Sequence, residues 1–140
     1  MTREENIKST RTAIRYLEQK RIKEFSELFT ENGKWIHPYH SGLFPPEIVG
    51  REEIYISLKK AADGFDETHF PIDKILPFDD PSMVAVRFTG NLKMKNGRGT
   101  YNNDYFAIFS FDEHGKILEW IEYYNPIIAA KAFGWIDKIK

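Results

Sequence analysis

The chain has 140 residues, a net charge of −1 and no cysteine. This length is typical of a single domain with one hydrophobic core, and the near-neutral charge argues against a nucleic-acid binder, which needs a concentrated basic face. Without cysteine, disulfides and thiol catalysis are excluded, and a reducing compartment is permitted. Aromatic residues make up 15% of the chain, and such large, rigid side chains suit both a core and a ligand pocket.

No apolar segment is long enough for a signal peptide or a membrane span, so we expect a cytoplasmic protein with no membrane partner. No internal repeat, low-complexity tract or linker interrupts the chain. Residues 1–140 are therefore expected to form a single domain.

Helices are predicted in the first half. Thr2 and Glu5 have the spacing of a capping box, and apolar residues then recur at helical spacing. A second, shorter helix is expected to end at Asn32-Gly33, and a third to span residues 51–62. A short strand at 34–38 and a loop at 39–50 separate the last two.

Strands are predicted in the second half. They cover 69–78, bent by its prolines, and then 83–95, 98–111 and 116–125, before a closing helical turn at 127–133. Helices first and a meander afterwards indicate an α+β fold. Gly90, alone on an apolar strand face, is the expected place for a kink that curves the sheet around a hollow.

Two predicted turns set the strand register. Asn96-Gly97 suits a two-residue type I′ turn, which pairs Phe88 with Tyr105 and Gly90 with Asn103. A four-residue loop at 112–115 then places Tyr105 opposite Glu122. A three- or five-residue loop turns Glu122 to the other face instead.

With the four-residue loop, one sheet face is apolar and aromatic except for a single carboxyl group, that of Glu122. This face collects Val84, Val86, Phe88, Tyr105, Ala107, Phe109, Leu118, Trp120, Glu122 and Tyr124. Burial raises a carboxyl pKa toward the range that a general acid or base needs near neutrality. Glu122 is therefore the predicted catalytic residue; the alternatives are a rim carboxylate bonded to Tyr105 and a solvent-facing strand residue.

The predicted ligand-binding residues surround this carboxyl. Tyr105, Tyr124 and Asn103 offer hydrogen bonds to it or to a ligand, while Trp120 and Phe88 offer aromatic walls. For the aromatic residues the alternative is core packing. For Asn103 it is backbone hydrogen bonding beside a hairpin.

Two histidines are separated by two residues. His37 and His40 flank Pro38 in a strand-to-loop passage with no third ligand evident, so we expect no metal and no other cofactor. His37 is instead a candidate to point into the pocket mouth and assist Glu122.

The opposite face of the strands is also partly apolar. It carries Phe106, Ile108, Ile121 and Tyr123 beside Arg87, Thr89 and Asp104. That mixture suits a subunit interface, so a homodimer through the outer sheet face is expected.

An ordered series of short segments resembles a known family. The series is Glu27-Leu28-Phe29-Thr30-Glu31-Asn32-Gly33, Gly50-Arg51, Phe78-Asp79-Asp80-Pro81, Tyr101-Asn102-Asn103-Asp104-Tyr105, Gly115-Lys116-Ile117, Glu122-Tyr123-Tyr124-Asn125 and Ala132-Phe133-Gly134. It resembles the phenazine-biosynthesis PhzA/PhzB proteins of the SnoaL-like group. The resemblance implies a nuclear transport factor 2-like, cone-shaped α+β barrel that forms homodimers and has a pocket between helices and sheet.

The resemblance also implies a site. A glutamate in the last strand of PhzA/PhzB acts as acid and base while two small cyclic ketones condense, and Glu122 matches it. The family's partner histidine corresponds to Ser57, which cannot shuttle protons near neutral pH. Two hypotheses follow: a cofactor-free isomerase, cyclase or condensation catalyst acting on a small organic molecule through Glu122, or a non-catalytic small-molecule-binding protein.

Overall fold

The computed structural model describes residues 2–140 and confirms the α+β class. In chain order the elements are α1 (Arg3–Glu18), α2 (Ile22–Ser26), β1 (Phe29–Ile36), β2 (Glu47–Val49), α3 (Arg51–Ala62), β3 (Phe65–His69), β4 (Ile72–Pro77), β5 (Met83–Met94), a 3-10 turn (Lys95–Gly97), β6 (Thr100–Phe111), β7 (Ile117–Tyr124), α4 (Pro126–Phe133) and a second 3-10 turn (Ile136–Lys138). None of the helices in residues 2–140 combines the length and apolar character that a membrane span requires.

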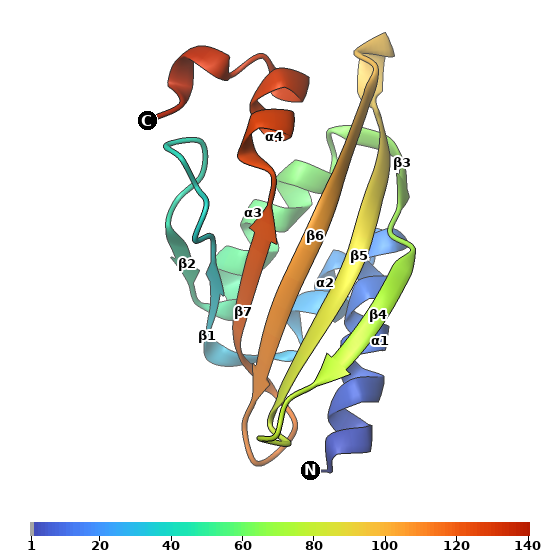
Figure 1. Ribbon diagram of the computed structural model, residues 1–140, viewed down its shortest axis with the longest axis vertical. Helices are drawn as coiled ribbons and strands as arrows, with labels where there is room; N and C mark the ends of the chain where they lie inside the picture. Colours follow the sequence, from blue (N-terminus) through green and yellow to red (C-terminus); the bar gives the residue numbers. More distant parts are fainter. Residues whose placement is uncertain (1) are drawn as a thin grey trace.

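One curved sheet organises the fold (Figure 1). Its strands run in the order β2-β1-β7-β6-β5-β3, and β4 shares the outer edge of β5 with β3. All pairs are antiparallel except β1 with β7. The sheet stays open, so the expected cone is a curved wall rather than a closed barrel. Helices α1, α2 and α3 lie against one face, and α4 lies beyond the end of β7.

Local sequence explains the first helix. The Glu5 backbone N–H donates to the Thr2 hydroxyl (3.1 Å), and the Thr2 backbone N–H donates to the Glu5 carboxylate (3.2 Å), which confirms the capping box. Thr10, Ile14 and Leu17 form the buried side of the helix. Helix α3 matches the predicted span of residues 51–62.

The second helix is shorter than predicted. It ends at Ser26, and Asn32-Gly33 lies within β1 instead of ending a helix. Strand β1 begins at Phe29, which pairs with Ile117 of β7, and the register shifts between Phe29 and Lys34. This parallel pairing with a strand about 90 residues away is a tertiary contact, which outweighs the helical spacing of the local sequence.

The predicted bent strand at 69–78 corresponds to β4, whereas β3 lies before it and shares only His69 with the predicted span. Both β3 and β4 pair with β5, and Phe70-Pro71 separates the two strands. Proline has no backbone N–H for the ladder, so the pairing stops there. The region therefore holds two strands where one bent strand was predicted, and the first of them begins four residues earlier than expected.

The first hairpin confirms the predicted register. Asn96 and Gly97 both have positive φ, and Phe88 pairs with Tyr105 and Gly90 with Asn103. Figure 1 shows the long β5–β6 hairpin rising past the other strands.

The second hairpin differs from the prediction. Asp112 and Lys116 close a three-residue loop, and Leu118 is an extra, unpaired residue between the pairs Phe111–Ile117 and Ser110–Glu119. Glu122 therefore lies opposite Ala107, and Tyr105 lies opposite Tyr124. The three-residue loop reverses the faces and the bulge at Leu118 reverses them again. Glu122 keeps its predicted face, whereas Leu118 is 43% exposed instead of facing inward.

Gly90 leaves room for two rings on the concave face. A Cβ at this position would lie 2.8 Å from Tyr105 Cε2 and 3.1 Å from Phe70 Cε1. The Tyr105 ring also stacks on Phe88, with centroids 5.0 Å apart. Gly90 thus lets the aromatic wall come close to the backbone of β5.

We predict that Gly90→Ala lowers the free energy of unfolding by about 1–3 kcal/mol, because the new methyl group overpacks the Tyr105 and Phe70 rings. Urea unfolding followed by circular dichroism measures the change. Asn91→Ala, on the exposed side of the same strand, is the matched control and should shift stability by less than about 0.5 kcal/mol. Equal stability of wild type and Gly90→Ala would contradict the close approach.

Candidate functional site

A cavity of about 160 Å³ lies between the helices and the concave face of the sheet. Its lining includes six of the seven residues predicted for the site: Phe88, His37, Tyr105, Trp120, Glu122 and Tyr124. Ala61 lines the cavity and is also exposed, so the cavity reaches solvent at the end of α3.

The two walls differ in chemistry. The first three helices contribute only apolar side chains, which are Leu17, Ile22, Leu58, Ala61 and Ala62. Nearly all polar side chains of the lining come from β6, β7 and the segment that continues β1. Any proton transfer in this cavity therefore takes place along the sheet wall.

Glu122 is the carboxyl of that wall. It is 8% exposed, and burial raises its pKa from 4.5 to about 8. The Trp35 indole N–H lowers this pKa in part, although its geometry is looser than that of a full hydrogen bond. Below pH 8 the group is mostly a neutral acid, available both to donate a proton and, once ionised, to accept one.

His37 lies beside Glu122 in the sheet register. Ile36 is paired with Ile121 in the parallel β1–β7 ladder, and the residues that follow them, His37 and Glu122, both line the cavity. His37 Nδ1 lies 3.0 Å from the Pro45 carbonyl oxygen. A carbonyl only accepts, so Nδ1 carries the proton and Nε2 is left as an acceptor.

Burial also sets the charge of His37. Loss of solvent lowers its pKa to about 4, against the opposing effect of the bond to Pro45. The ring packs between Trp35, with centroids 4.4 Å apart, and Phe44, at 5.8 Å. At neutral pH the site therefore holds a neutral imidazole beside a mostly neutral carboxylic acid.

Stacked rings hold Trp120 in place. Trp35 stacks on one face (4.6 Å, interplanar angle 7°) and Phe109 lies parallel on the other (6.0 Å, 6°). Phe25 packs edge-on against the same indole. The wall beneath Glu122 is rigid as a result, because each ring is confined by its neighbours.

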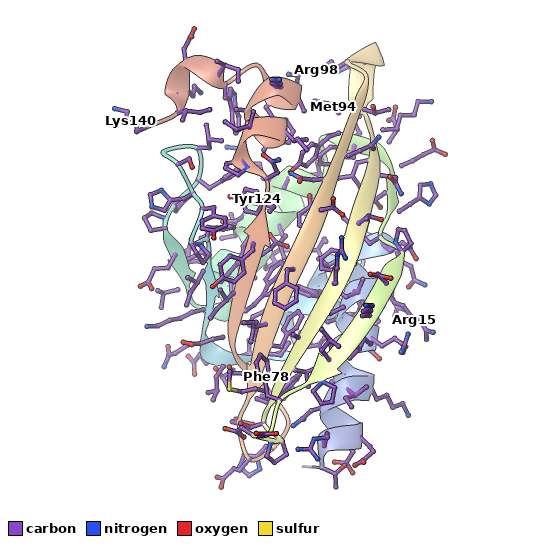
Figure 2. The ribbon with its side chains drawn as sticks, viewed as in Figure 1. Arg15, Phe78, Met94, Arg98, Tyr124 and Lys140 are labelled. Carbon is purple, nitrogen blue, oxygen red and sulfur yellow. The ribbon has the colours of Figure 1, made fainter. Side chains whose placement is uncertain are left out.

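Three tyrosines line the upper part of the sheet wall. Burial raises the pKa of Tyr101, Tyr105 and Tyr124, so all three stay protonated near neutral pH. Figure 2 labels Tyr124 at the end of β7 that faces α4. The Tyr124 hydroxyl is buried and has no hydrogen-bond partner within residues 2–140.

Two positions singled out from the sequence lie outside the cavity lining. Asn103 donates to the Tyr101 hydroxyl (2.8 Å) and to the Asn125 carbonyl (3.0 Å), and its own oxygen accepts from the Asn125 backbone N–H (3.2 Å). Its amide thus ties the ends of β6 and β7 together. Ser57 is half-buried on α3, where the next residue, Leu58, lines the cavity.

Sequence reasoning missed Trp35, Tyr101 and Phe44. Trp35 lies two residues before His37 in a predicted strand and so shares its face, a signal that was present in the sequence. Phe44 comes from the loop after β1, and no local pattern places a loop residue in a cavity. Within residues 2–140 no group of three or more His, Asp or Glu side chains is arranged to hold a metal.

The two shifted pKa values predict a pH-dependent stability. Glu122 holds its proton in the folded state at pH values where the unfolded chain has released it, so its contribution to stability falls as pH rises from 4.5 to about 8. The lowered pKa of His37 has the opposite effect, because its contribution to stability falls as pH drops from 6.5 to about 4. The range above pH 6.5 therefore isolates Glu122.

We expect the wild type to lose about 1–2 kcal/mol relative to Glu122→Gln between pH 6.5 and 8.5, because the glutamine does not titrate. Urea unfolding of both proteins across this range measures the difference. Carbon-13 NMR of the Glu122 carboxyl gives the pKa directly. Parallel stability curves, or a carboxyl that titrates normally, would contradict the buried acid.

Comparison with known proteins identifies the family and the fold. Residues 10–120 match the SnoaL-like domain family. YesE from Bacillus subtilis (strain 168) is 24% identical over 131 residues, which cover 94% of this chain and 88% of YesE.

Two solved structures share the fold. One is a Bacillus subtilis protein with a provisional description as an isomerase, with a TM-score of 0.86, 23% identity, and coverage of 96% of this chain and 97% of that one. The other is a phenazine biosynthesis-related protein from Pseudomonas aeruginosa, with a TM-score of 0.76, 23% identity, and coverage of 95% and 83%. Because the family match covers most of its length, the chain belongs to the SnoaL-like family.

Proposed function

We propose that this protein is a cofactor-free acid–base catalyst, an isomerase or cyclase, that acts on a small cyclic or carbonyl compound through Glu122. The observation that carries the proposal is a buried carboxyl on an apolar cavity wall, with its pKa raised to about 8. A group that titrates close to neutral pH serves efficiently as both acid and base. The descriptions of the similar proteins, as a provisional isomerase and a phenazine biosynthesis-related protein, support small-molecule chemistry.

The proposed reaction is a proton transfer within the cavity. Ionised Glu122 removes a proton from the carbon next to a carbonyl group, and the electron pair moves to the carbonyl oxygen. The resulting enol or enolate accepts a hydrogen bond from the sheet wall, where Tyr124 has an unpartnered hydroxyl. Glu122 then returns the proton to the same or a different carbon, so no redox partner is needed.

The alternative is a small-molecule-binding protein without catalysis. Ser57 stands where the resemblance places a histidine, and the wall formed by the first three helices carries no group that titrates. His37 is the one imidazole of the lining, and it supplies an acceptor from the sheet side instead. Catalysis must then depend on Glu122 with His37, whereas binding requires neither.

Exchange of the α-hydrogens of cyclohexanone with D₂O separates the two functions. We expect the wild type to accelerate exchange over buffer, and Glu122→Gln to reduce the enzymatic rate by at least about 100-fold, since the amide cannot accept the proton. Glu119→Gln, three residues earlier in β7 and absent from the cavity lining, should retain the wild-type rate. No acceleration by the wild type, with saturable binding of the ketone, would favour the binding protein.

We also propose a homodimer through the outer sheet face, in the cytoplasm that a cysteine-free chain permits. Phe106 is 36% exposed, and Ile108, Ile121 and Tyr123 beside it are half-buried. Together they form an apolar area on the face of the sheet away from the helices, as expected for an interface core.

Phe106→Glu is expected to convert the dimer to a monomer, because it puts two buried charges at the centre of a two-fold interface. Sedimentation velocity measures the mass. Arg98→Glu, at the tip of the β5–β6 hairpin labelled in Figure 2, is the control and should remain dimeric. A wild-type monomer at micromolar concentration would refute the dimer.

A further inference from the structure

Unpartnered hydrogen-bond donors gather in the lining of the cavity. The indole N–H groups of Trp35 and Trp120 and the hydroxyl of Tyr124 are buried without a partner among residues 2–140. All three side chains line the cavity, and all come from the sheet wall or its continuation. The Trp35 N–H interacts in part with the Glu122 carboxyl, whereas the donors of Trp120 and Tyr124 have no partner in residues 2–140. Buried polar groups are nearly always paired, so donors left free on a cavity wall suit a ligand that supplies the acceptor.

The Glu122 carboxyl adds a fourth donor. While it holds its proton it can donate to an oxygen, as the Trp35 indole beside it can. An indole N–H only donates. The lining also offers acceptors, which are His37 Nε2, the carbonyl oxygen of the protonated Glu122 carboxyl and the oxygen of the Tyr124 hydroxyl. Because the two indole N–H groups only donate and the Tyr124 and Glu122 hydroxyls can donate, the polar groups of the sheet wall suit a ligand oxygen that accepts hydrogen bonds.

Positive charge is missing from the lining. None of its residues is Lys or Arg. The titratable side chains that face Glu122 are His37, Tyr101, Tyr105 and Tyr124, and burial favours the neutral form of each. Leu17, Ile22 and Leu58 from the helices, Phe65 and Thr68 from β3, and Phe133 from α4 do not titrate. A carboxylate ligand would lose its hydration without gaining a counter-ion.

The size and shape of the cavity favour one flat ring. Its volume is about 160 Å³, close to the roughly 150 Å³ of an apolar protein cavity that holds benzene. Aromatic side chains make up much of the lining, among them Phe88, Tyr105 and Trp35. Aromatic rings pack favourably against one another edge-on or in offset stacks, so such a lining suits a ring.

From these observations we infer that the cavity selects an uncharged one-ring compound with a hydrogen-bond-accepting oxygen, a cyclic ketone or enone, and excludes its carboxylate counterparts. This inference names the substrate class of the site and rests on the proposed function only for its location. The ring lies against the aromatic walls, and its oxygen meets the donors of Trp35, Tyr124 and Glu122. Desolvation of a charged ligand in a lining without cations opposes entry of an anion.

Three matched one-ring probes test the selection: cyclohex-2-enone, cyclohexene and cyclohex-1-ene-1-carboxylate. Calorimetric titration of the wild type at pH 6.5 measures their affinities. We expect the enone to bind at least about tenfold more tightly than cyclohexene, the value of one well-made hydrogen bond to a buried donor. The carboxylate should bind more weakly than either. Equal or tighter binding of the carboxylate, or no difference between enone and cyclohexene, would overturn the inference.

A variant that removes one donor and keeps its ring sharpens the test. Trp35→Phe should weaken enone binding several-fold and leave cyclohexene binding unchanged, because only the enone uses the indole N–H. Trp135→Phe, an indole outside the cavity lining, is the matched control. Near-ultraviolet circular dichroism checks that both variants fold. If Trp35→Phe weakened the binding of the enone and of cyclohexene equally, the effect would come from lost packing and not from the lost N–H.

Glu122→Gln separates this inference from the proposed function. The amide still donates, so enone selectivity should persist while hydrogen exchange is lost. Selective enone binding without exchange by the wild type leaves the substrate class standing and refutes catalysis. Hydrogen exchange by the wild type, together with tighter binding of the carboxylate than of the enone, would support catalysis and refute the inferred substrate class.

Discussion

The carboxyl of Glu122 is removed from water on a wall of stacked rings, and the chemistry of the site depends on that burial. In water the group would be ionised at neutral pH and hydrogen-bonded to solvent; between Trp35 and the tyrosines of the sheet its pKa rises to about 8. The neighbouring His37 responds to the same loss of solvent in the opposite sense, with a pKa of about 4. Both groups are thus neutral for one physical reason, the cost of a charge in an apolar cavity.

That burial in turn depends on strand register. Glu122 faces the cavity because the three-residue loop and the bulge at Leu118 each shift β7 by one residue relative to the predicted hairpin with a four-residue loop. The total shift of two residues keeps the carboxyl on the same face. An odd shift would have placed the carboxyl on the outer face among Phe106 and Tyr123. Gly90 contributes from the neighbouring strand, since the Tyr105 ring occupies the space that a Cβ would need. The site is therefore a property of backbone geometry across β5, β6 and β7.

The cavity combines apolar side chains from the first three helices with a largely aromatic sheet wall that carries nearly all of its polar groups. Small domains of this kind host different functions on one scaffold, so function has to be argued from the side chains of the site. Here the residues that bear on chemistry are Glu122, His37 and the unpartnered donors of Trp35, Trp120 and Tyr124. Their arrangement favours proton transfer on a neutral carbonyl compound, and the same donors would serve a binding protein.

The sequence by itself determined the α+β class, the capped first helix, the span of α3 and the first hairpin, because each depends on spacing within a short segment or on one turn. It placed Glu122 on the correct face, but through a four-residue loop that the structure replaces with a three-residue loop and a bulge. Only the tertiary structure decided that β1 begins at Phe29, that Leu118 forms a bulge, and that Trp35 and Phe44 join the cavity. Those outcomes depend on contacts between distant segments, above all the parallel pairing of β1 with β7. Local sequence patterns do not predict such pairings, because the free energy of the pairing comes from side chains that meet only in the folded chain.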